Sequence, residues 1–457
     1  MIEQTFFNLH TKKGLKMVIE ETRQFDRIVR GVYELTAKEV YGTENPEGLA
    51  VFAYGSPGRI ELIGGDSDAD LLLVEEERNS KTEQFRKSFK DELGRFDFSK
   101  VDLTSWGTYN EIETYLKKSL VEGNQVLEAR YLIGNKKVKN EIERKKRKYN
   151  SIERGLENII FNRLYFNQYF RQRIRDGAIN IKYCPGGSRD FLFVGWYDKL
   201  SRMISGEKQE NSYQPRIKVG VKRLFEQEKI TKSELVTSLE AISFSMMFRS
   251  NVLRVNKNTS DKGLTFIDEL TLQRLQEVGY PKPDITKKTF EQYRKSIDKI
   301  SYIIWNETIK KSGLIMSQRW ENRFREAVSL ETSPSERSKM SSEDSLIRIG
   351  LIWGASEADE EQLLKSLATK HKDTDNWATI GSLACSPYCP PEILHHFGAG
   401  IAKEDGYGYL LRIIARNKNT EKETLENIAR DSSLEKRYTE VAEAALIGGN
   451  KHANNQI

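Results

Sequence analysis

The stretch "YGSPGRIELIGGDSDADLLLV", residues Tyr54–Val74, limits the fold of this chain more than any other. It starts where the apolar run Gly48–Tyr54 ends, and it closes with a second apolar run, Asp68–Val74. Short apolar runs bounded by glycine and other turn residues are typical of buried strands. We therefore predict two strands joined through a Gly-Ser turn, with an Asp-x-Asp pair at the head of the second strand.

Asp68 and Asp70 in this pair are candidate metal ligands. Residues two apart on a strand share a face, so the two carboxylates should point the same way. Adjacent carboxylates repel unless a cation neutralises them, and Mg²⁺ prefers a few carboxylates together with phosphate oxygens. A third acid is expected from a neighbouring strand, and Asp102 in the predicted strand Phe96–Trp106 is placed for that. Three carboxylates can hold two metal ions, one at the attacking oxygen and one at a triphosphate.

Gly55, Ser56 and Arg59 are candidates for phosphate binding. A glycine at the end of a strand lets backbone N–H groups approach phosphate oxygens, and a serine hydroxyl adds a donor. The guanidinium of Arg59 can neutralise phosphate charge with a planar fork of N–H groups. Each feature alone is also typical of an ordinary turn, helix cap or edge residue. Their order along the two strands is what favours a nucleotide site.

Together, Gly55-Ser56, Arg59 and Ser67–Leu71 resemble the signature of the polymerase-β-type nucleotidyltransferase superfamily. The closest resemblance is to the branch of glutamine-synthetase adenylyltransferase and PII uridylyltransferase, and it covers about Val51 to Pro283, roughly half the chain. Three further stretches resemble that branch: the strand Val101–Leu103, the helical segment "LEARYLIGN" at Leu127–Asn135, and the loop "NIKYCPGGSRDFLF" at Asn180–Phe193. In that loop Lys182 and Arg189 match, whereas Leu192 replaces the family's glutamate.

The resemblance implies a magnesium-dependent enzyme that transfers AMP or UMP from ATP or UTP to a protein hydroxyl and releases pyrophosphate. It implies that Asp68, Asp70 and Asp102 are catalytic and hold two Mg²⁺ ions. Nucleotide binding would fall to Gly55, Ser56, Arg59, Lys182 and Arg189. Two alternatives stay open: nucleotidyl transfer to RNA or a small molecule, and a non-catalytic scaffold or binding protein.

The domain organisation follows from periodicity and composition. Residues 1–110 are expected to form an α/β (α+β) nucleotidyltransferase domain with a small mixed sheet, and residues 111–328 an all-α domain bounding the active site. The first domain should contain the helix Ser80–Leu93 and the amphipathic helix Thr22–Glu39, in which Phe25, Ile28, Val29, Val32 and Leu35 share a face.

Residues 329–345 form a Ser-rich linker. Residues 346–457 are expected to form a helical-repeat module of variant leucine-rich or HEAT-like type, because Leu363, Ile393 and Thr424 mark similar segments about 30 residues apart. Such repeats present concave surfaces, which suits recruitment of a protein acceptor.

Composition limits the partners. The chain has 73 basic and 67 acidic residues, a balance of +6 that does not by itself indicate nucleic acid. The basic run Asn135–Asn150 is interrupted by Glu141 and Glu143 and is typical of a solvated helix face, with a nucleic-acid patch as the alternative. No apolar run approaches the ~18 residues of a membrane span. The stretch Met1–Gly14 has no signal-peptide pattern, so we expect a cytoplasmic protein.

Overall fold

The chain is described by a computed structural model in which helices predominate. The described residues are 2–63, 69–96, 101–118, 121–152, 155–156, 159–160, 179–181, 187, 190–207, 213–256, 266–316, 318–340, 344–374, 376–399, 408–431 and 436–448. Two compact units are present: unit 1 is Met1–Glu113, Gln125–Ile152 and Ile174–Ile304, and unit 2 is Thr114–Asn124, Glu153–Arg173 and Trp305–Ile457. The three-domain division stays a prediction. No helix in these described ranges is long and apolar enough to cross a bilayer.

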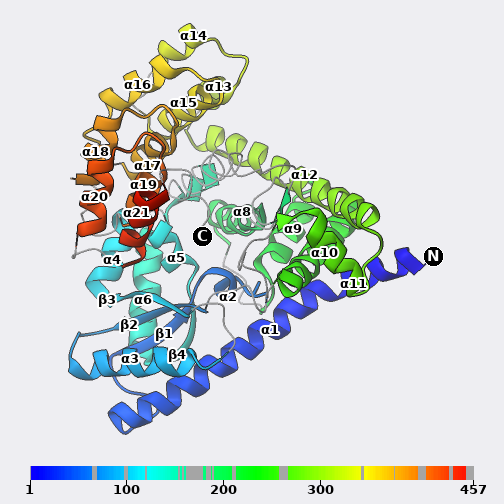
Figure 1. Ribbon diagram of the computed structural model, residues 1–457, viewed down its shortest axis with the longest axis vertical. Coiled ribbons are helices and arrows are strands. Elements are labelled where there is room, and N and C mark those ends of the chain that lie inside the picture. The colour runs from blue at the N-terminus through cyan, green and yellow to red at the C-terminus, as the bar shows by residue number, and fades with distance from the viewer. Residues whose placement is uncertain are drawn as a thin grey trace. The chain divides into compact units, whose positions relative to one another are not determined.

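A four-stranded mixed sheet forms the centre of the N-terminal part of unit 1 (Figure 1). Its order is β3-β2-β1-β4, with β1 antiparallel to both β2 and β4, and β2 parallel to β3. The strands are β1 (Leu49–Ala53), β2 (Ala69–Glu75), β3 (Val101–Thr108) and β4 (Arg130–Gly134). The α+β prediction with a small mixed sheet is therefore confirmed. The third strand starts at Val101 rather than Phe96, and residues 97–100 lie outside the described ranges.

One face of the sheet packs on α1 (Ile2–Tyr41) and α3 (Ser80–Leu93), which lie side by side (Figure 1). α3 has the predicted bounds, and a capping box at Asn79 fixes its start. The shared core contains alternate strand residues and aromatic rings from both helices: Leu49, Val51, Leu71, Leu73, Phe25, Phe85 and Phe89.

α1 differs from the predicted helix Thr22–Glu39 in its length and in one buried position. Its buried stripe continues from Val32 to Thr36, which is 1% exposed. Leu35 lies at the edge of that stripe and is 73% exposed, so the prediction that it faces the core is wrong. The 3.6-residue period places position 36, not 35, in line with positions 25, 29 and 32.

The expectation of an all-helical segment from residue 111 is wrong at β4. The sequence "RYLIG" carries an aromatic and a β-branched residue, and it pairs along β1 as the edge strand of the sheet. The sheet thus takes a strand from beyond residue 110. A further short pair, β5 (Ile179–Asn180) with β6 (Phe266–Ile267), is antiparallel.

Helices make up the rest of unit 1 in the described ranges. They include α2 (Gly55–Arg59), α6 (Lys136–Tyr149), α8 (Asp190–Ser205), α9 (Arg216–Glu226), α10 (Lys232–Asn256) and α11 (Glu269–Glu277). Three helices continue into unit 2: α4 (Tyr109–Lys118), α5 (Val121–Glu128) and α12 (Pro283–Met316). Phe248 stacks on Phe244 and Phe290 in a buried aromatic core formed by α10 and α12.

The C-terminal part of unit 2 consists of short helices that repeat. They are α13 (Gln318–Val328), α14 (Pro334–Ser338), α15 (Ser345–Glu357), α16 (Glu361–Lys370), α17 (Trp377–Cys385), α18 (Pro391–Ala399), α19 (Gly408–Arg416), α20 (Lys422–Arg430) and α21 (Lys436–Gly448). Alternate helices pack together, since α17 contacts α15 and α19, α19 contacts α21, and α18 contacts α20. This arrangement of helices in pairs fits the predicted helical repeat.

Two side chains, Arg337 and Asn417, stabilise the C-terminal helices of unit 2. Arg337, within the predicted Ser-rich linker, is 1% exposed, and its guanidinium contacts the Glu360 carboxylate and the carbonyl of Ser329. Much of that segment is therefore ordered against α15 and α16. Farther along, the amide of Asn417 donates to the carbonyls of Ala384 at 2.6 Å and Ser386 at 2.8 Å, tying one repeat to the next.

We expect Asn417→Ala to destabilise unit 2 by about 1–3 kcal/mol, because two buried carbonyls lose their donor. The measurement is denaturant unfolding followed by circular dichroism. Lys422→Ala is the control, since within the described part of the chain Lys422 is an exposed side chain that pairs with Glu426. Equal midpoints for the two variants would contradict the role given to Asn417.

Candidate functional site

The turn after β1 lies directly against the start of β2. The Tyr54 N–H donates to the Asp70 carbonyl at 3.1 Å, which extends the β1–β2 ladder by one residue. Gly55 follows with a φ of +58°, and a Cβ atom there would lie 2.1 Å from Oδ2 of Asp70. Only glycine combines this backbone conformation with the absence of a side chain. Gly55 therefore lets the carboxylate of Asp70 lie against the backbone of the turn.

Asp70 belongs to the face of the sheet away from α1 and α3. Leu71 and Leu73 are in the core shared with those helices, and side chains alternate along a strand. Asp70 is half-buried and pairs in register with Asp102 on the parallel neighbour β3. Positions in register on adjacent strands share a face, so two of the three predicted acids occupy neighbouring places on the sheet.

The predicted metal set is only partly within the described residues. Asp68 lies outside them, and of Asp102 the backbone alone is described. Within the described ranges, no group of three or more His, Cys, Asp or Glu residues could hold a metal ion. The part that is described fits a divalent cation: the Asp70 carboxylate lies at a strand start against the backbone of a glycine turn, and an aspartate position is in register with it.

Ser56 and Arg59, on the short helix α2, have different surroundings. The Ser56 side chain is half-buried and makes no hydrogen bond to any residue in the described ranges, so its hydroxyl can serve a ligand. Arg59 is already engaged. Its Nε donates to Glu61 Oε2 at 3.0 Å, and its Nη1 donates to Glu128 Oε2 at 3.1 Å. Phosphate binding by Arg59 stays a prediction; its observed contacts fix the end of α2.

The Arg59 cluster links α2 to two later helices. The other oxygen of Glu61 accepts the N–H of Ile217 at 3.0 Å, in the first turn of α9. The indole of Trp196 on α8 donates to Glu128. Burial raises the pKa of Glu61, and Arg59 opposes that shift. The side chains of Arg59, Glu61 and Glu128 are 13%, 6% and 13% exposed, so each charge depends on its partners.

Arg130 supports the same turn from β4. It donates to both oxygens of Asp26 on α1 at 2.8 Å, and it also donates to the carbonyl of Pro57 in α2 at 3.1 Å. Tyr213 completes the group, because its hydroxyl donates to Asp26 at 3.0 Å and its ring lies 5.3 Å from the guanidinium. Sequence reasoning missed Glu128 and Arg130 as parts of the site. Both stand in the stretch "LEARYLIGN", which is one of the segments that carry the resemblance.

The remaining predicted residues are not brought to this site by any described contact. Lys182 and Arg189 lie outside the described ranges. The basic run forms α6, and most of its cations have acidic partners: Lys137 with Glu76, Arg144 with Glu141, Lys145 and Lys148 with Glu113, and Lys146 with Glu143. The pairs of Lys137, Arg144 and Lys148 lie at the surface, which is typical of a solvated helix face, whereas Lys145 and Lys146 are mostly buried.

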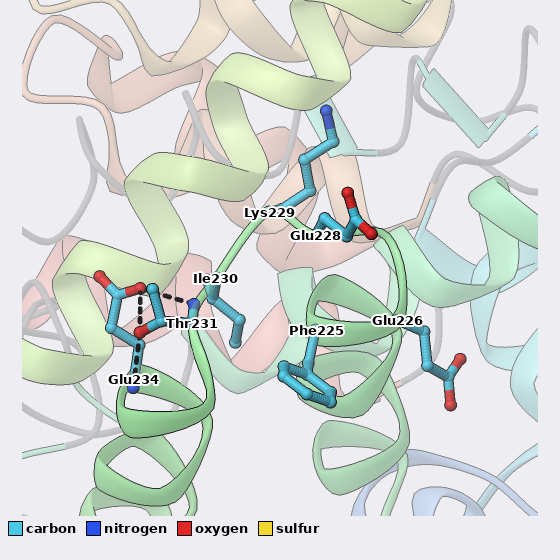
Figure 2. Close-up of a pocket in the computed structure, with 7 residues that line it drawn as sticks. All are labelled: Phe225, Glu226, Glu228, Lys229, Ile230, Thr231 and Glu234. Atoms are coloured by element: carbon cyan, nitrogen blue, oxygen red, sulfur yellow. Dashed lines mark hydrogen bonds between the residues drawn. The ribbon is translucent and has the colours of Figure 1, made fainter.

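A pocket of about 580 Å³ lies elsewhere, at the turn between α9 and α10 (Figure 2). Its side chains include Phe225, Ile230, Thr231 and Glu234, and none of the predicted site residues lines it. The Glu234 carboxylate accepts from the N–H and hydroxyl of Thr231 and from Lys299, contacts that lower its pKa to about 2. These groups cap α10 and leave the pocket without a reactive set.

Comparison with known proteins gives no family for this chain: no protein-family model matches it, and no curated protein matches it.

The close approach of Gly55 to Asp70 predicts the effect of adding a side chain at position 55. Gly55→Ala should destabilise the protein by about 1–2 kcal/mol for the left-handed backbone and by a further ~1–3 kcal/mol for the displaced carboxylate. Gly42→Ala is the matched control, because Gly42 has a φ of +74° with nothing within 4 Å of the added Cβ. Thermal unfolding of both variants isolates the second contribution. Equal losses would contradict the close approach.

The buried ion pairs of Arg59 predict a large loss of stability when its charge is removed. Arg59→Gln should cost about 3–5 kcal/mol of unfolding free energy, because Glu61 and Glu128 stay buried without their cation. Adding Glu61→Gln to that variant should recover part of the loss. Arg95→Gln, which breaks an exposed pair with Glu92, should change little. Additive effects of Arg59→Gln and Glu61→Gln in urea unfolding would show that the two side chains do not interact.

Proposed function

We propose that this protein is a magnesium-dependent nucleotidyltransferase. The observation that carries the proposal is the Asp70 carboxylate at the start of β2, seated against Gly55 and in register with Asp102. An acid pair beside a glycine turn suits a triphosphate, because a metal ion held by the carboxylates and the backbone N–H groups of the turn would both bind phosphate oxygens.

The roles of the residues follow from that placement. Asp70 and Asp102, with Asp68, would hold two Mg²⁺ ions. When bound, these ions would neutralise the negative charge of the triphosphate and the charge that develops in the transition state. The Ser56 hydroxyl donates to a phosphate oxygen, and the backbone at Gly55 lies beside it. Asp102 accepts the proton of the acceptor hydroxyl. The acceptor oxygen bonds to the α-phosphorus while the bond from that phosphorus to pyrophosphate breaks. Lys182 and Arg189 are further candidates for nucleotide contact.

Arg59 and Arg130 contribute in this proposal by positioning the turn. Arg59 joins α2 to Glu61 and Glu128, and Arg130 joins it to Asp26. A turn fixed before the substrate binds needs no reorganisation during the reaction, and preorganised donors and charges supply much of the rate in such transfers.

The group transferred is AMP or UMP, and the acceptor is a protein hydroxyl, with the C-terminal repeats as the recruiting surface. Transfer to RNA is less well supported, because most of the α6 cations are paired with acids of the protein itself. Transfer to a small molecule would use the same metal site, whereas a non-catalytic scaffold would not use it for chemistry. A single labelling experiment separates these four possibilities.

The test is a labelling assay with the full chain, magnesium and each α-labelled nucleoside triphosphate, alone and with a native cell lysate. Asp70→Asn should reduce transfer by a factor of about 10² or more, since it removes one charge at the point of electrostatic stabilisation. Asp91→Asn, an exposed aspartate on α3, is the matched control and should retain full transfer.

Label on a protein that disappears with Asp70→Asn would support the proposal and name both nucleotide and acceptor. Label on RNA alone, or on a small molecule alone, would overturn the protein acceptor and put that molecule in its place. Equal transfer by wild type and Asp70→Asn would overturn the catalytic role of Asp70. No transfer from any nucleotide in the presence of lysate would favour the scaffold.

A further inference from the structure

We propose that Ile60, the residue that ends α2, is a positioning residue for nucleotide binding, because its left-handed backbone fixes the turn that carries Gly55 and Ser56. The inference rests on the proposed function, since it concerns the same turn. Ile60 has a φ of 62° and a ψ of 44°, and it is 4% exposed. It does not touch the nucleotide in this proposal and acts through the residues on either side of it.

The backbone conformation of Ile60 is unusual for its residue type. In the left-handed region the Cβ atom crowds the backbone, and a branched Cβ makes the crowding worse, so glycine is the usual residue there. Within the described ranges, two other non-glycine residues have a positive φ, Glu228 at 56° and Asp359 at 54°. Both are exposed and unbranched at Cβ, whereas Ile60 is buried and branched. Backbone strain of this kind persists only where the surroundings impose it, and it is concentrated at functional sites.

The left-handed conformation of Ile60 closes the turn. Its N–H donates to the Pro57 carbonyl at 3.3 Å, and the Glu61 N–H donates to the Ser56 carbonyl at 2.9 Å. These two hydrogen bonds form a Schellman motif, which needs a left-handed residue directly after the helix. The chain therefore reverses at Ile60, and Glu61 fixes the backbone of Ser56, whose hydroxyl is the proposed phosphate donor.

The same reversal directs the Glu61 side chain back onto α2 and onto α9. Its carboxylate accepts from Arg59 Nε at 3.0 Å and from the N–H of Ile217 at 3.0 Å. With Ile60 in a right-handed or extended conformation, the chain after α2 would take another direction and lose both contacts together with the bond to Ser56. One pair of backbone angles thus decides three contacts of the turn.

An isoleucine at position 60 restricts the turn more than a glycine would. Its buried apolar side chain stabilises the folded turn and offsets the backbone strain, and Leu62 and Ile63 after it are buried as well. Glycine would adopt the left-handed conformation without strain, but it populates right-handed and extended conformations about as readily. We therefore expect the turn of an Ile60→Gly variant to be in its binding conformation for only part of the time.

The first measurement is hydrogen–deuterium exchange of the full chain without nucleotide. Ile60→Gly should speed exchange of the Glu61 and Ile217 amides about tenfold or more, because the contacts that protect both N–H groups depend on residue 60. Ile60→Val keeps a branched, apolar side chain and should exchange as wild type does. Equal exchange of the two amides in Ile60→Gly and wild type would overturn the proposal.

Glu228→Gly is the matched control. Glu228 ends α9 with the same pair of hydrogen bonds, since its N–H donates to the Phe225 carbonyl and the Lys229 N–H donates to the Leu224 carbonyl, both at 2.9 Å. Its side chain is exposed, and it follows the opposite end of α9 from Ile217. The substitution should therefore change neither the exchange of the Ile217 amide nor nucleotide binding.

The second measurement is calorimetric titration of the full chain with Mg²⁺ and non-hydrolysable analogues of ATP and UTP. If the turn of Ile60→Gly is in its binding conformation about one tenth of the time, the dissociation constant should rise about tenfold. Ile60→Val and Glu228→Gly should bind as wild type does. A residue that contributes to stability alone would leave the dissociation constant unchanged at a temperature where every variant is folded.

The outcomes separate this inference from the proposed reaction. Binding of an analogue by wild type that is weakened by Ile60→Gly and kept by Ile60→Val would support the positioning role, even if the labelling assay shows no transfer and so overturns the reaction. Faster exchange with an unchanged dissociation constant would overturn the positioning role. Failure of wild type to bind either analogue would overturn it as well.

Discussion

The contact between the Asp70 carboxylate and the backbone of Gly55 is the constraint on which the site depends. It requires a residue without a side chain in a left-handed conformation at the end of β1, and it requires β2 to start opposite that residue. The antiparallel register of β1 with β2 meets the second condition, and the parallel register of β2 with β3 brings Asp102 alongside. Any change that moves the turn by an ångström would also displace the carboxylate of Asp70.

The turn is held from several distant parts of unit 1. Arg130 reaches it from β4, Glu61 ties it to the first turn of α9, and Glu128 ties it to Trp196 on α8. The hydrogen bond from the N–H of Ile217 to the Glu61 carboxylate joins residues that are 156 positions apart in the sequence. Charges in these contacts are buried, so removing one partner is costly while the complete set is stable. This explains how a five-residue helix rich in glycine and proline can have a fixed position.

Sequence alone could predict the elements whose signals are local. The apolar runs that form β1 and β2 are short and bounded by turn residues. α3 has buried apolar residues at intervals of four positions and a capping box at its start. β4 was missed because five residues carry too little periodicity, and its strand conformation comes from pairing with β1. Leu35 was misplaced for a related reason, since the edge of a helical stripe is decided by what packs against it.

For the site, the Gly-Ser turn and the aspartates could be identified as candidates from their order. The partners of Arg59 could not, because Glu128 and Ile217 are brought to it only by the tertiary fold.

The most direct measurement of the central claim is a crystal structure of the full chain with Mg²⁺ and a non-hydrolysable nucleoside triphosphate. Our account predicts metal ions on the Asp70 and Asp102 carboxylates, with the triphosphate beside Gly55 and Ser56 and the Arg59 ion pairs intact. A triphosphate bound elsewhere on the chain, with no metal at Asp70, would contradict it.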